Sequence, residues 1–155
     1  MFRPLRVSWS SKSLMCHVNS ANMEETIFTK IVKGEIPCYK VAENDKFLAF
    51  LDISPVAKGH TLVITKIQND YIFDLEDELL AEMSVFSKKV AKAIRQVVPC
   101  KRIGVAVIGL DVPHNHIHLV PINGGGDLDF TGPRVQLSKD EFAALAADIS
   151  GKIEL

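Results

Sequence analysis

The feature that most constrains the fold is a strand-like segment in which histidines alternate with apolar residues. His114, His116 and His118 occupy every second position, with Ile117 and Leu119 following the same alternation. On a β-strand, residues two apart point to the same face. The three imidazoles should therefore share one face while the isoleucine and leucine point to the other. This pattern predicts a sheet that packs a core on one side and carries polar chemistry on the other.

Periodicity elsewhere predicts helices and further strands. Apolar residues recur at intervals of three and four over residues 75–97, which is typical of a long amphipathic helix. Thr26 can cap a short helix that stops at Gly34. Ser138, with Glu141 completing a capping box, begins a final helix over about residues 138–153. Five runs favour strands: Cys38–Ala42, Phe47–Leu51, His60–Thr65, Arg102–Ile108 and Asn115–Ile122.

This order of elements predicts an α+β domain with a mostly antiparallel sheet and helices on one face. With 155 residues, the chain has the length of one ordinary domain. Residues 1–22 differ from the rest, because they are rich in serine and carry three basic residues and no acidic one. We expect them to be a disordered extension or to precede the true start at Met23; an organelle transit peptide is the alternative. Residues 23–155 should form the domain.

Composition excludes several classes of function. Outside the basic N-terminal residues the chain has a net charge of −4, which argues against a nucleic-acid groove. No apolar run approaches the roughly 20 residues that span a bilayer. Three scattered cysteines favour a reducing compartment, and we expect a cytoplasmic protein. A phosphorylated ligand would have to be small and held by imidazoles and local dipoles.

Three imidazoles on one face are not explained by packing, since each one needs a hydrogen-bond partner when buried. Two chemical interpretations remain open. Three histidines and an open position could form a catalytic zinc centre, although Asp111 is the only nearby carboxylate that could orient them. Alternatively, a neutral imidazole could attack phosphorus, with neighbouring histidines moving protons or donating to phosphate oxygens. His60 begins another strand-like run and could join either site.

Four motifs occur in order along residues 26–122: Thr26–Pro37 (TIFTKIVKGEIP), Leu48–Pro55 (LAFLDISP), Gly59–Ile64 (GHTLVI) and His114–Pro121 (HNHIHLVP). Together they resemble the histidine-triad (HIT) family, in its nucleotide-binding, Hint-like branch. The resemblance implies a five-stranded antiparallel sheet with two helices that dimerises into a ten-stranded sheet. It also implies cleavage of purine nucleoside 5′-phosphoramidates or related adenylated compounds through a nucleotidyl-histidine intermediate. Neither a metal nor another cofactor is expected.

The resemblance assigns roles to the histidines. It makes His116 the nucleophile, and it places His118 and His60 near phosphate oxygens or in proton transfer. His114 would order the network. In the metal-dependent alternative, the three triad histidines would instead be ligands of one ion.

For the nucleoside, the resemblance makes Asp52 the acceptor of the ribose hydroxyls. Ile27, Phe28 and Ile53 would form an apolar slot for the purine. The alternatives for these positions are a turn capped by the aspartate and ordinary core packing by the apolar residues.

The segment before the triad departs from the family pattern. Many relatives hold the phosphate with an asparagine and a Gly-Gln-Ser or Gly-Gln-Thr segment. Here residues 107–113 read Val-Ile-Gly-Leu-Asp-Val-Pro, without that asparagine or a hydroxyl. This leaves a second hypothesis open, a nucleotide-binding regulatory module with vestigial catalysis.

Overall fold

Five antiparallel strands form one sheet in the part of the chain that the structure, a computed structural model, describes (residues 24–154). They are β1 Lys40–Glu43, β2 Phe47–Leu51, β3 Thr61–Thr65, β4 Arg102–Ala106 and β5 His116–Ile122, in the order β1-β2-β3-β5-β4. This confirms the predicted five-stranded antiparallel sheet. Residues 1–22, expected to be an extension, lie outside the described residues.

Side-chain caps mark the start of the first and last of the three α-helices. The helices are α1 Ile27–Val32, α2 Asp77–Val97 and α3 Lys139–Ser150, with short 3₁₀ turns at Ile72–Asp74 and Gly125–Leu128. The Thr26 side chain accepts a hydrogen bond at the start of α1, and Ser138 and Glu141 form the predicted capping box of α3. Gly34 has a φ of 78°, which suits the chain reversal after α1. Within residues 24–154, no helix is long and apolar enough to cross a membrane.

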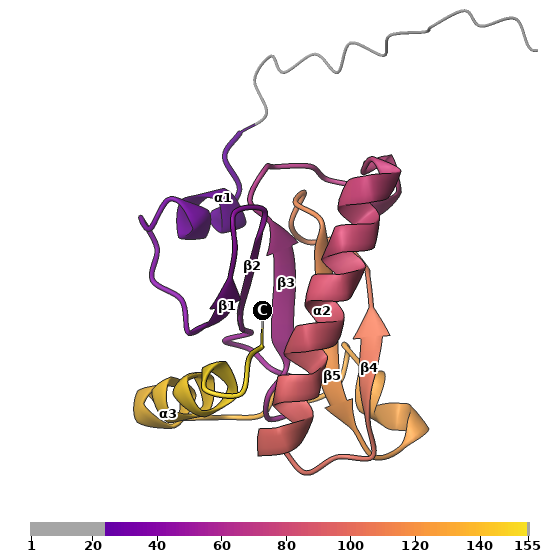
Figure 1. Ribbon diagram of the computed structural model, residues 1–155. Coiled ribbons are helices and arrows are strands. Elements are labelled where there is room, and N and C mark those ends of the chain that lie inside the picture. Colours follow the sequence, from indigo (N-terminus) through magenta and orange to yellow (C-terminus); the bar gives the residue numbers. More distant parts are fainter. Residues whose placement is uncertain (1–23, 155) are drawn as a thin grey trace, which may run out of the picture.

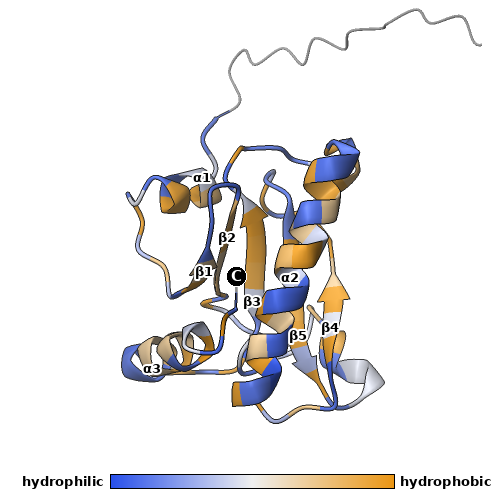
Figure 2. Ribbon diagram, viewed as in Figure 1, coloured by the Kyte–Doolittle hydropathy of each residue, from blue (hydrophilic) through white to orange (hydrophobic). Residues whose placement is uncertain are grey.

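The sheet is buried on both faces around β2 and β3. Figure 1 shows α2 lying across the sheet and α3 beside its β1 side, and both contact the strands. Their apolar sides, visible in Figure 2, pack with Ala49, Leu51 and Val63 in the main core. Leu62 and Ile64 alternate with these residues and form a second apolar cluster with other residues, Phe28 of α1 among them. The two long helices therefore share one face, and the short α1 covers part of the other.

The strand register brings the histidines to the face that carries α1. Ile64 pairs with His116, and Leu62 pairs with His118. Residues paired across antiparallel strands point to the same side, so both histidines share the face of the second cluster. Ile117 lies in the main core on the opposite side. The alternation predicted from the sequence is thus present in β5.

Candidate active site

A cavity of about 310 Å³ opens on the histidine-bearing face of the sheet. It is formed where the residues after β2, the segment before β5, the first half of β5 and the segment before α3 meet. Larger hollows elsewhere are not lined by the triad. The lining residues are Asp52, Ser54, Ile108, Gly109, Leu110, Asp111, His116, His118, Phe130 and Arg134.

His114 is fully buried and uses both ring nitrogens within the protein. Its Nε2–H donates to the Thr65 carbonyl oxygen at 2.7 Å, because a carbonyl can only accept. Nδ1 must then accept from the Thr26 hydroxyl, whose oxygen lies 3.0 Å away. Burial lowers the pKa of His114, so the ring stays neutral. His114 does not line the cavity. Its two hydrogen bonds connect the segment just before β5 to the start of α1 and to the end of β3.

His116 has a fixed tautomer. Its Nδ1–H donates to the backbone carbonyl of His114 at 2.7 Å, which leaves the lone pair on Nε2. Phe28 packs edge-on against the ring, with centroids 5.2 Å apart. His116 lines the cavity and is 6% exposed. An imidazole whose Nε2 is not used by a protein partner is suited to nucleophilic attack.

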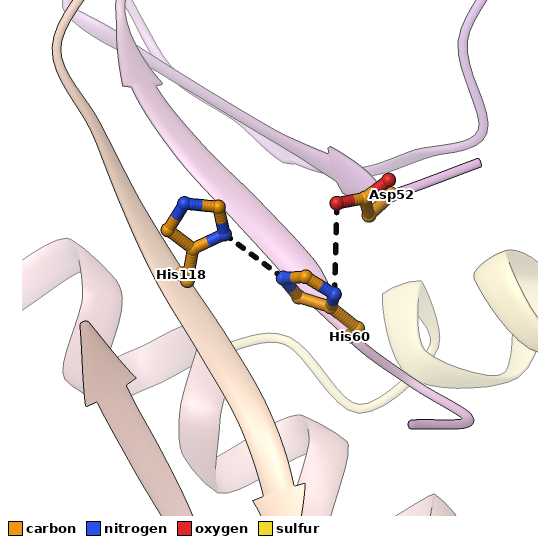
Figure 3. Close-up of side chains that lie close together, drawn as sticks. All are labelled: Asp52, His60 and His118. Carbon is orange, nitrogen blue, oxygen red and sulfur yellow. Dashed lines mark hydrogen bonds and ion pairs between the residues drawn. The ribbon is translucent and has the colours of Figure 1, made fainter. Parts of the chain in front are cut away.

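A second chain of hydrogen bonds orients His118 (Figure 3). The Val56 backbone N–H donates to Nδ1 of His60 at 3.3 Å, so the proton of His60 is on Nε2. That Nε2–H donates to Nδ1 of His118 at 3.0 Å. The remaining nitrogen of His118, Nε2, therefore carries a proton and is a donor. Phe130 lies edge-on to His118 with centroids 4.8 Å apart.

Burial keeps these two histidines neutral. It lowers the pKa of His60 to about 4, although the Asp52 carboxylate, 3.5 Å from Nδ1, partly opposes the shift. Burial likewise lowers the pKa of His118 to about 3, and a proton on His116 or His60, or the charge of Arg134, would lower it further. At neutral pH the two rings can donate and accept hydrogen bonds but bring no charge to the cavity.

Asp52 uses its two carboxylate oxygens differently. Oδ1 accepts from the Ser54 backbone N–H at 2.8 Å, which is the turn-capping role considered as an alternative. Oδ2 faces His60, and the residue lines the cavity. Capping the turn leaves this second oxygen available to a ligand.

The three residues expected to bind the purine are not brought together in the cavity. Ile27 is 48% exposed and Ile53 is 74% exposed, and neither lines it. Phe28 is buried, packing edge-on against His114, His116 and Phe50. The apolar slot formed by Ile27, Phe28 and Ile53 therefore stays a prediction.

Sequence reasoning missed Phe130 and Arg134. They are the only aromatic and the only basic residue between Asn123 and Leu137, which is the one signal that could have singled them out. The Val135 N–H donates to the Pro55 carbonyl at 2.8 Å and holds their segment beside the loop that follows Asp52.

The geometry also bears on the metal hypothesis. Among the described residues, Asp52, His60 and His118 each offer a ligand atom, and these atoms lie within 4.8 Å of one another. The three triad histidines are not such a group among the described residues, and both nitrogens of His114 are already bonded, to Thr26 and Thr65. A site built from His114, His116 and His118 would require His114 to give up a buried hydrogen bond.

Comparison with known proteins agrees with this geometry. The HIT domain family matches residues 33–124, which include β1 to β5. Adenosine 5′-monophosphoramidase hnt1 of Schizosaccharomyces pombe is 41% identical over 130 residues, 83% of this chain and 98% of the relative. Adenosine 5′-monophosphoramidase HNT1 of Saccharomyces cerevisiae is 32% identical over 130 residues, 83% of this chain and 82% of the relative.

Solved structures give the same result. The crystal structure of a Hit-like protein involved in cell-cycle regulation from Bartonella henselae superposes with a TM-score of 0.73. It is 29% identical in sequence, and the match covers 86% of this chain and 99% of that one. With its triad, its sheet and these relatives, the chain belongs to the histidine-triad (HIT) family.

Proposed function

We propose that this protein is a nucleotide hydrolase that cleaves purine nucleoside 5′-phosphoramidates or related adenylated compounds through a nucleotidyl-histidine intermediate. The observation that carries the proposal is the hydrogen bond from Nδ1–H of His116 to the His114 carbonyl. It leaves a lone pair on Nε2 of a residue that lines the cavity. The two fungal relatives are named adenosine 5′-monophosphoramidases, which supports the choice of substrate class.

The reaction has two displacement steps at phosphorus. In the first, the lone pair on Nε2 of His116 forms a bond to the α-phosphorus, the phosphorus–nitrogen bond breaks, and the departing amine takes up a proton. In the second, water attacks the same phosphorus and loses a proton while the bond to His116 breaks. The products are the amine and a nucleoside monophosphate, and His116 returns to its starting tautomer.

The other histidines prepare this attack. His118 directs Nε2–H outward as a consequence of its bond to His60, so it can donate to a phosphate oxygen or to the leaving group. His60 fixes that tautomer and Asp52 lies beside it, with one oxygen available to the ribose hydroxyls. His114 orders the network through its carbonyl, which binds His116.

The β4 edge supports the expected homodimer. In the described sheet β4 pairs on one side only, with β5. Val105 is 62% exposed on this edge. An unpaired edge with exposed apolar residues is a template for strand pairing, and a two-fold β4–β4 contact would create a ten-stranded sheet. Sedimentation at micromolar concentration should show a dimer that Val105→Lys dissociates, and a wild-type monomer would refute this.

The cytoplasmic location also stays a prediction. It rests on the cysteine content, and Cys38 and Cys100 are free thiols among the described residues. Fractionation of cells expressing the full chain would test it.

The hydrolase proposal is tested by release of AMP from adenosine 5′-phosphoramidate. His116→Asn should lower the rate by roughly 1000-fold or more, because it removes the path of the reaction, while AMP affinity changes little. Treatment with a chelator should leave the wild-type rate unchanged. Activity that is lost on chelation and restored by zinc would favour the metal-dependent alternative. AMP binding without turnover would favour a regulatory module.

A further inference from the structure

The proposed reaction places an anionic phosphate in a cavity where His118, and His60 bonded to it, are neutral. His60 and His118 have pKa values of about 4 and about 3, so neither brings a charge near neutral pH. Two carboxylates, Asp52 and Asp111, also line the cavity and repel an anion. Residues 107–113, which precede the triad, include no asparagine and no hydroxyl side chain. A positively charged side chain is needed to offset the repulsion between the phosphate and the carboxylates of Asp52 and Asp111.

Arg134 is the only basic residue among those lining the cavity. In the described residues, its one side-chain hydrogen bond runs from Nη2 to the Phe130 carbonyl at 2.6 Å, and it forms no ion pair. Most of the guanidinium donors are therefore available to a ligand. Arg134 lines the same cavity as His118, and its charge lowers the pKa of both His118 and His60.

The segment that carries Arg134 is held over the site from both ends. The Phe130 ring packs edge-on against His118 and His60, with centroids 4.8 and 5.9 Å away. At the other end, the Val135 N–H is bonded to the Pro55 carbonyl. The bond to the Phe130 carbonyl restrains the guanidinium itself. Restraint of this kind reduces the entropy that a long side chain loses when it binds a ligand.

We propose that Arg134 binds the non-bridging oxygens of the nucleotide phosphate and supplies the positive charge that the segment before β5 lacks. The inference rests on the proposed function for the identity of the ligand. It makes the C-terminal part of the chain a part of the phosphate site, because Arg134 precedes α3. A guanidinium suits this role, since its planar set of donors can bind two phosphate oxygens at once.

The test compares binding of AMP and adenosine to the full chain by calorimetry. Arg134→Gln should weaken AMP binding roughly 10- to 100-fold, the usual range for a lost charge-assisted contact. Adenosine binding should change less than about twofold, because ribose and base contacts remain, and this also reports that the variant is folded. Arg134→Lys should recover part of the AMP affinity. Arg95→Gln, on an exposed position of α2, is the matched control and should leave both affinities unchanged.

Two results would overturn the inference: an Arg134→Gln variant that binds AMP as wild type does, or a wild type that binds AMP no more tightly than adenosine. Failure of the hydrolase proposal looks different. In that case AMP affinity would depend on Arg134 while wild type released no AMP from adenosine 5′-phosphoramidate.

Discussion

Thr26 connects the first helix to the buried end of the triad, and replacing it by valine should be costly. The hydroxyl oxygen accepts from the Thr29 backbone N–H at 3.1 Å and lies 3.0 Å from Nδ1 of His114. Valine preserves the branched shape of the side chain but removes both interactions. Thr26 is 7% exposed and His114 is 0% exposed, so solvent cannot replace the lost donor.

The magnitude follows from the two lost bonds. Loss of an N-cap hydroxyl costs about 1 kcal/mol, and a buried acceptor left without a donor costs about 1–3 kcal/mol. Thr26→Val should therefore lower the free energy of unfolding by about 2–4 kcal/mol. Thr26→Ser keeps the hydroxyl and loses one methyl group, so its cost should be about 1 kcal/mol or less.

Urea or guanidinium denaturation of wild type and both variants measures these differences at a fixed protein concentration, which matters because a dimer's stability depends on concentration. The comparison of valine with serine isolates the hydroxyl. A Thr26→Val variant as stable as Thr26→Ser would refute the assignment of a Thr26 proton to His114.

Two further predictions concern stability. His60 and His118 are neutral in the fold. Their contribution to the free energy of unfolding is therefore complete above about pH 6.5 and is lost as the pH falls toward their pKa values of about 4 and about 3. The free energy of unfolding should fall by about 1.4 kcal/mol per pH unit for each histidine. His118→Asn should therefore reduce the slope by about 1.4 kcal/mol per pH unit, and an unchanged slope would contradict the assignment. Gly59→Ala should lower the free energy of unfolding by about 2–4 kcal/mol, because φ is 87° and a Cβ would lie 2.8 Å from the Val98 side chain. Gly34 has a similar φ of 78°, but a Cβ there would meet open space, so Gly34→Ala should cost only about 1–2 kcal/mol. Equal losses in calorimetric melting would show that the contact with Val98 is relieved without cost.

The sequence predicted those parts of the fold whose signals are local. Alternation in β5, the caps at Thr26 and Ser138, and the period of α2 each depend on neighbours within a few residues. The predicted ends of strands were less accurate where apolar residues continue beyond the last residue that pairs with a neighbouring strand. The strand predicted to reach Ile108 ends at Ala106, which is the last residue of β4 paired with β5. Val107 and Ile108 are about two-fifths exposed beyond it.

The parts of the site that could not be predicted depend on contacts between distant segments. The bond between Thr26 and His114 joins residues 88 positions apart. Arg134 reaches the cavity because its neighbour bonds to Pro55, and no periodicity encodes that contact. The exposure of Ile27 and Ile53 was likewise not evident, since apolar residues in a motif are equally compatible with core and surface.

The central claim is that His116 becomes covalently bonded to the nucleotide, and rapid-quench mass spectrometry tests it most directly. Wild-type protein mixed with an adenylated substrate and quenched within milliseconds should carry an acid-labile nucleotidyl group on a peptide containing His116. His116→Asn should carry none, although it still binds AMP. A His116→Asn protein that forms the labelled species at the wild-type rate would contradict the account.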